Sequence, residues 1–146
     1  MEPEDTIDYN IRKTWYNISK MYNKTANKYM GSMALGMIIL NIDINRGTPS
    51  TKLGPIMGME STSLSRSLKK LEELELIERT MDLKDKRKSV IKLTKKGKKR
   101  RELAKKTVLD FNDQVFSYFK KEETDVFFKI LQKVNRIIEK INKQKQ

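Results

Sequence analysis

Apolar residues recur every three or four positions over long stretches at both ends of the chain, a pattern typical of helices with one buried face. The first stretch predicts an amphipathic helix of about 25 residues that ends near Gly31, with its stripe formed by Ile7, Ile11, Trp15, Ile18, Tyr22, Ala26 and Tyr29. The last stretch begins at Thr124 or at the acids before it, and its stripe contains Phe127, Ile130, Leu131, Val134, Ile137, Ile138 and Ile141. Two long terminal helices, each with one apolar side, are therefore expected.

Shorter helices are predicted between them. Residues 33–40 are apolar nearly all round, which predicts a buried helix that stops before Asn45. Residues 48–50, Thr-Pro-Ser, supply a cap residue and a first-turn proline for a short helix that Gly58 ends. A fourth helix runs over about 61–74. Two short helices joined through a glycine predict a helix-turn-helix.

A β-hairpin and a fifth helix follow. Residues 77–80 and 89–93 are typical of strands and bracket the polar segment 82–88, which predicts a hairpin with a charged tip. Thr94 is placed to cap a helix whose first turns are rich in Lys and Arg and whose later turns are apolar. The predicted fold class is mainly α with a small β-wing: a winged helix-turn-helix flanked by N- and C-terminal helices.

At 146 residues the chain fits one domain. We expect residues 32–106 to form the winged helix-turn-helix lobe, and residues 1–31 and 107–146 to form dimerisation helices. The apolar stripes of the terminal helices exceed what so small a central unit can cover. A second copy of the chain is the expected cover, so the pattern predicts a homodimer with intertwined terminal helices.

Charge is concentrated between Arg79 and Lys106, where fourteen Lys or Arg and three acids leave a net charge of +11 out of the chain's +13. Such a cluster repels itself in a compact fold, and a nucleic-acid backbone is the commonest partner that relieves it. The simpler interpretation is a solvated run of charge. Strand and helix patterns frame these residues, however, which favours an ordered nucleic-acid surface.

Composition excludes several classes of function. The chain has no Cys and no His, which removes disulfides, thiol redox sensing, zinc sites built on these ligands, and catalysis by imidazole or thiolate. No Gly-rich phosphate loop or nucleophile elbow is present. We therefore expect no enzymatic activity, no cofactor and no metal site. No apolar run approaches 18 residues and no leader pattern opens the chain, so a cytoplasmic location and no membrane span are expected.

Candidate DNA contacts lie on the fourth helix. In a winged helix-turn-helix, this helix enters the major groove and the hairpin reaches the minor groove. Ser61, Thr62 and Ser63 carry hydroxyls that can bond to bases or phosphates, Arg66 has the planar fork that matches guanine, and Lys69 suits a phosphate contact. The simpler interpretation is a capping serine and a solvated arginine.

The hairpin tip supplies the remaining candidates for DNA binding, which are Lys84, Lys86, Arg87 and Lys88. Arg87 is the best candidate for a minor-groove contact, since a narrow groove concentrates negative potential.

Three short motifs then stand in a specific order: Leu71-Glu72 through Leu76–Arg79, then Asp85-Lys86-Arg87, then Leu93-Thr94-Lys95-Lys96-Gly97. With them the chain resembles the MarR family of bacterial transcriptional regulators over nearly its whole length. The resemblance implies a triangular dimer whose two lobes bind a pseudo-palindromic operator in double-stranded DNA, usually to repress transcription. It also implies that Arg87 enters the minor groove and that Asp85 supports the wing.

The chain departs from the family pattern at Glu75, where glycine is common just past the fourth helix. A non-glycine residue in a left-handed cap costs of order 1 kcal/mol, unless the helix ends differently here. Lys86 also replaces the usual arginine, which keeps the charge and loses the planar fork.

The resemblance also suggests a ligand site, because many relatives release DNA when a small aromatic or acyl compound binds near the first, second and fifth helices. Here an anionic ligand would be neutralised by Arg12 or Lys13, within a cavity lined by Trp15, Tyr16, Tyr22, Met33, Met37 and Phe111. The simpler interpretation makes these side chains part of the core or of a dimer interface.

Two other functions stay open from the residues alone. A nonspecific nucleic-acid packaging or RNA-binding module would use the same basic surface without sequence preference. Docking on an anionic membrane would need large apolar residues opposite the lysines of the fifth helix, and the basic segment lacks them.

Overall fold

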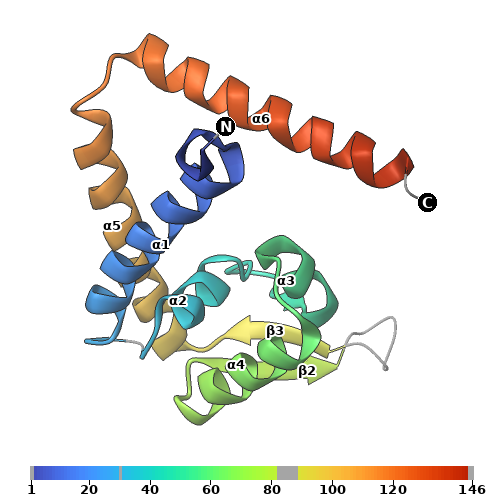
Figure 1. Cartoon of the computed structure of the whole chain (residues 1–146). Coiled ribbons are helices and arrows are strands. Elements are labelled where there is room, and N and C mark those ends of the chain that lie inside the picture. Colours follow the sequence, from blue (N-terminus) through green and yellow to red (C-terminus); the bar gives the residue numbers. More distant parts are fainter. Residues whose placement is uncertain (1, 30, 82–88, 145–146) are drawn as a thin grey trace. The chain divides into compact units, whose positions relative to one another are not determined.

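The computed structural model of the chain describes residues 2–29, 31–81 and 89–144. The elements follow in the order η1 (Pro3–Asp5), α1 (Ile7–Ala26), α2 (Met33–Leu40), β1 (Thr48–Pro49), α3 (Ser50–Met57), α4 (Ser61–Glu73), β2 (Ile77–Met81), β3 (Ser89–Leu93), α5 (Lys95–Phe116) and α6 (Lys121–Gln144) (Figure 1). The chain divides into two compact units, Met1–Thr107 and Val108–Gln146. A mostly helical chain with a small antiparallel sheet confirms the predicted fold class.

The core of the first unit is centred on α2, as the all-round apolar pattern predicts. Ile38 and Ile39 of α2 are fully buried together with Ile42, Leu53, Leu71 and Ile91 from the neighbouring segments. Each such aliphatic side chain contributes roughly 1.5–3 kcal/mol through its removal from water. This core fixes α3, α4 and the sheet against one another.

The sheet contains three antiparallel strands in the order β1-β3-β2. The hairpin pairs Ile77 with Leu93 and Met81 with Ser89. The prediction that Thr48 and Pro49 open α3 as cap and first turn is wrong, because these two residues form β1 and pair with β3. The edge of a sheet tolerates a proline, which has no N–H to donate.

Thr48 is buried, and its hydroxyl is engaged by the turn before β1, so it does not cap α3. The Thr48 Oγ1 accepts a hydrogen bond from the Asp43 amide at 3.0 Å. The Asp43 carboxylate in turn accepts bonds from the amides of Arg46 and Asn45, and these bonds hold the pKa of Asp43 below its usual value. The turn between α2 and β1 is therefore fixed by local hydrogen bonds.

Three helix ends depend on left-handed residues. The end of α3 at Gly58, with φ +60°, confirms the prediction. The first helix ends at Ala26, earlier than predicted, and the amide of Gly31, with φ +91°, donates to the Ala26 carbonyl at 3.1 Å. Glu75 follows α4 with φ +59°. Glu75, which stands where the family commonly has glycine, therefore keeps the left-handed conformation that favours glycine.

The second unit contains the end of α5 and all of α6. The last helix begins at Lys121, and the Glu123 carboxylate accepts a hydrogen bond from the Lys120 amide at 2.8 Å just before it. Phe116 and Phe128 pack edge to face with ring centroids 6.3 Å apart. Most of the apolar stripe of α6 is exposed within the chain, including Phe127 (56%), Ile130 (55%) and Ile138 (49%).

A membrane-spanning helix would need a long and apolar segment. Among the residues that the structure describes, none of the helices has both properties.

Candidate nucleic-acid interface

The fourth helix has one face in the core and one in solvent. Its three leucines, Leu64, Leu68 and Leu71, are 7%, 2% and 0% exposed and attach it to the core. The opposite face carries Thr62, Arg66 and Lys69, while Ser61 and Ser63 lie in the first turn, and all five predicted contact residues are exposed. The leucine spacing of four and three residues thus places Thr62 and the two cations outward.

The outward side chains of α4 are available to an external partner. The N-cap of α4 is Glu60, so Ser61 belongs to the first turn and is not the cap, contrary to the simpler interpretation. Within residues 2–29, 31–81 and 89–144, no hydrogen bond or ion pair is found for the side chains of Ser61, Arg66 or Lys69. An external polar partner therefore finds these groups accessible.

The base of the hairpin is attached directly to α4. Arg79 of β2 donates from Nε to the Glu72 carboxylate of α4 at 2.9 Å. At the other side of the sheet, the hydroxyls of Ser50 and Ser89 lie 2.9 Å apart and connect α3 to β3. These contacts fix the hairpin relative to the helix-turn-helix. The predicted tip residues Lys84, Asp85, Lys86, Arg87 and Lys88 lie outside the described residues.

The contact between Glu72 and Arg79, which holds the base of the hairpin, was not predicted from the sequence. Glu72 and Arg79 are opposite charges seven residues apart, on different elements, so no helical or strand periodicity singles them out. The sequence feature that could have drawn attention to both residues is their place in the segment 71–79, which resembles the MarR family.

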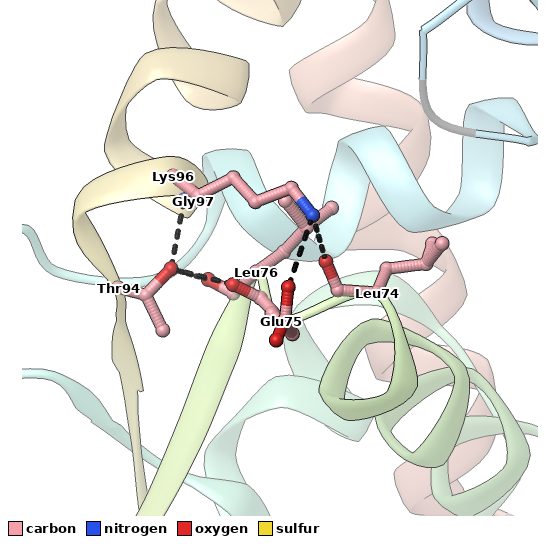
Figure 2. A network of polar contacts seen from close by, with 6 residues as sticks. All are labelled: Leu74, Glu75, Leu76, Thr94, Lys96 and Gly97. Carbon is pink, nitrogen blue, oxygen red and sulfur yellow. Dashed lines mark hydrogen bonds and ion pairs between the residues drawn. The ribbon is translucent and has the colours of Figure 1, made fainter.

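The carboxyl end of α4 meets the first turn of α5 (Figure 2). The Thr94 hydroxyl accepts a hydrogen bond from the Gly97 amide at 3.0 Å, which confirms Thr94 as the cap of α5. The same hydroxyl donates to the Glu75 carbonyl at 2.7 Å. Lys96 donates from Nζ to the Leu74 carbonyl at 2.8 Å and lies 3.4 Å from the Glu75 carboxylate. The Thr94 amide donates to the Leu76 carbonyl at 3.1 Å, so three consecutive residues after α4 are bonded to α5 or its cap.

Gly97 is required by this close approach. A β-carbon at Gly97 would lie 1.9 Å from the carbonyl oxygen of Leu76, which is far inside van der Waals contact. Gly97 is buried, and only hydrogen in place of a side chain lets α5 pack here.

Basic residues cover the solvent face of α5 opposite this contact. Lys95, Lys98, Lys99 and Lys105 are exposed, whereas Gly97, Arg101 and Ala104 face inward. Arg101 donates from Nη2 to the Leu40 carbonyl at 3.4 Å, so this cation serves packing within the first unit.

The residues predicted to line a ligand cavity are distributed over both units. Trp15 and Tyr16 of α1 are 47% and 65% exposed. Tyr22, Met33 and Met37 are half-buried in the first unit, and burial raises the pKa of Tyr22. Arg12 lies 5.9 Å from the centroid of the Tyr9 ring, and Phe111 belongs to the second unit.

A cavity of about 230 Å³ lies elsewhere in the first unit, beside the carboxyl end of α4. Its walls come from the α1–α2 connection, α4 and α5, and they contain none of the predicted ligand residues; the lining consists of Asn27, Tyr29, Gly31, Lys70, Leu74, Leu76, Lys96 and Arg100.

Comparison with known proteins also indicates a winged helix DNA-binding domain. Residues 37–97 match the family model of a winged helix DNA-binding domain. The chain is 31% identical over 106 residues to the HTH-type transcriptional regulator BilQ of Clostridium symbiosum (strain WAL-14163), covering 71% of this chain and 74% of that protein.

Solved structures share the fold. A MarR/EmrR family transcriptional regulator from Acinetobacter sp. ADP1 superposes with a TM-score of 0.83 at 24% identity, covering 96% of this chain and 99% of that one. MepR of S. aureus, solved as a complex with DNA, gives a TM-score of 0.80 at 19% identity, covering 90% and 97%. These solved MarR-family structures share the fold of this chain over nearly its whole length, and the chain itself belongs to the HTH-type transcriptional regulators with a winged helix DNA-binding domain.

Proposed function

We propose that this regulator is a repressor that binds a pseudo-palindromic operator as a homodimer and releases it when a small anionic ligand binds. The observation that carries the DNA-binding part is the solvent face of α4, where three hydroxyls and two cations stand exposed on a helix held by three buried leucines. A rigid helix with short polar side chains in its first turn suits insertion into a major groove.

The side chains of α4 divide by chemistry. Arg66 presents five N–H donors in a planar fork, which matches the O6 and N7 acceptors of guanine. Ser61, Thr62 and Ser63 are short enough to bring the helix close to base edges or phosphates. Lys69 is a flexible point charge farther along the helix and suits a phosphate.

The wing completes the proposed interface. Lys84, Lys86, Arg87 and Lys88 would carry positive charge toward the minor groove, with Arg87 inside it and Asp85 supporting the hairpin. The attachment of β2 to α4 through Arg79 and Glu72 supports this proposal, because it makes the two DNA-contacting elements move as one.

Homodimer formation is supported by apolar faces that the chain does not cover. Phe127, Ile130 and Ile138 on α6 are each about half exposed, as are Ile7 and Ile11 on α1. Exposed stripes on two long helices exceed the scattered apolar residues of an ordinary monomer surface. A two-fold dimer would bury them and would place two α4 helices about one turn of DNA apart.

The ligand part of the proposal rests on the candidate cavity residues. Trp15, Tyr16, Tyr22, Met33 and Met37 of the first unit offer aromatic and thioether surface, and Arg12 offers a charge for an anionic group. The complex of MepR with DNA supports DNA as the partner.

A gel-shift titration on the DNA around its own gene, with shuffled duplex as competitor, tests the function. The proposal expects a preference for the specific site of about 10³-fold or more, together with a steep loss of affinity as salt is raised. Equal affinity for shuffled duplex would instead support the nonspecific nucleic-acid module that the exposed lysines of α5 also permit.

A further inference from the structure

The carboxyl end of α4 is held by a side chain from another element. Lys96 is the second residue of α5, and its Nζ donates to the carbonyl of Leu74, which caps α4. A cation at this position satisfies one of the free carbonyls at the end of a helix and lies at the negative end of the helix dipole (Figure 2).

The position of Lys96 is unfavourable for its own helix. The first turn of α5 contains no acid and begins with two lysines, which places positive charge at the positive end of the α5 dipole. The same charge is favourable for α4, whose end it contacts. The contact therefore explains a residue that the dipole of α5 alone would disfavour.

Glu75 joins the same contact through both its backbone and its side chain. The residue adopts the left-handed conformation that glycine adopts without strain, with φ +59°. Its carbonyl accepts from the Thr94 hydroxyl at 2.7 Å, and its carboxylate lies 3.4 Å from Lys96 Nζ. The α4 exit is thus fixed from one side by Thr94 and from the other by Lys96.

A small tilt of α4 would matter at its opposite end. With a rise of 1.5 Å per residue, the 13 residues of α4 span about 20 Å, so a tilt of about 3° at the carboxyl end moves the first turn by about 1 Å. Recognition of base edges needs placement within about 0.5 Å. Ser61 and Arg66 depend on this placement far more than a contact to a phosphate does.

We propose that Lys96 is a positioning residue for operator recognition: it fixes the carboxyl end of α4 and thereby sets the sequence preference of the helix without touching DNA. The inference rests on the proposed function, since it concerns how a specific operator is discriminated from other duplexes. It assigns a role in specificity to a residue of α5, outside the helix-turn-helix and the wing.

The test measures the affinities of the full-length protein for its operator and for a shuffled duplex by fluorescence anisotropy, over a range of salt concentrations. Lys96→Gln removes the cation that holds α4. Lys95→Gln is the matched control, because Lys95 carries the same charge in the same turn and makes no hydrogen bond or ion pair with any described residue. Lys96→Arg keeps a cation that can reach the Leu74 carbonyl.

The proposal expects Lys96→Gln to lower the ratio of operator affinity to shuffled affinity by roughly tenfold, with the salt slope unchanged. Lys95→Gln should leave this ratio within about twofold of the original, and Lys96→Arg should restore most of it.

Two results would overturn the proposal. Equal losses for both duplexes, with a salt slope smaller by about 1.8 for the two copies of the dimer, would make Lys96 a direct phosphate contact. An unchanged ratio in Lys96→Gln would remove its positioning role. If the unsubstituted protein shows no operator preference, the proposed function itself fails, which the first titration of the series reveals.

Discussion

At the scale of single residues, backbone contacts decide more than side-chain chemistry. Gly97 lies against the Leu76 carbonyl, where a β-carbon would have no space. Gly58 also follows a helix, yet among the described residues other than its two chain neighbours no atom lies within 4 Å of where its β-carbon would be, and its positive φ alone favours glycine. The two glycines therefore serve different physical needs.

Replacing Gly97 by alanine should destabilise the fold by about 3 kcal/mol, because the methyl group forces α5 away from the residues that follow α4. Thermal unfolding followed by circular dichroism should show a melting temperature lower by roughly 10 °C. Gly58→Ala is the control and should cost only about 1 kcal/mol of left-handed strain. A Gly97→Ala variant as stable as the control would contradict this packing.

Some of these residues could be predicted from the sequence and others could not. The cap at Thr94 is a local signal, since a threonine directly before a helical pattern bonds to an amide three residues on. The left-handed Glu75 was one of two predicted possibilities, because the family pattern has glycine there. Lys96 contacts a carbonyl 22 residues away, and no periodicity in the chain signals such a contact.

At the scale of elements, the helices and the hairpin strands were predictable from the sequence, and the shortest strand, β1, was not. The spacing of apolar residues in α2 and α4 predicts that α2 and the leucines of α4 are buried, as the structure shows. The strand β1 has only two residues, one of them a proline, and its pairing with β3 connects residues more than 40 positions apart. Thr48 and Pro49 are residue types that commonly open a helix, but here they pair with β3 instead.

The face of α4 should separate two kinds of DNA contact. Arg66→Ala should cost about 1–3 kcal/mol of operator affinity per half-site and relax the preference at one base pair in each, because a bidentate contact to a base is lost. Lys69→Ala should weaken operator and shuffled duplex alike and reduce the salt slope of the dimer by about 1.8, that is, about 0.9 for each of its two copies. Anisotropy titrations against a panel of single-base operator variants measure both effects. Identical behaviour of the two variants would show that α4 does not read bases.

At the scale of the whole molecule, a second copy would cover the exposed apolar faces of α1 and α6 in the proposed dimer. Placing a charge on the stripe of α6 with Ile138→Glu should shift the protein from dimer to monomer, since a buried charge without a partner is costly. Lys140→Glu, on the opposite side of the same helix, should leave the dimer intact. Sedimentation velocity distinguishes the two states. A monomer in the unsubstituted protein would show that these faces have another partner.

In the proposed dimer, two α4 helices read one duplex in a sequence-dependent way. Hydroxyl-radical footprinting on the DNA upstream of its own gene tests this arrangement. We expect two protected half-sites related by inverted symmetry, with centres about one helical turn apart. Protection of a single half-site, or uniform protection without any boundary, would contradict it.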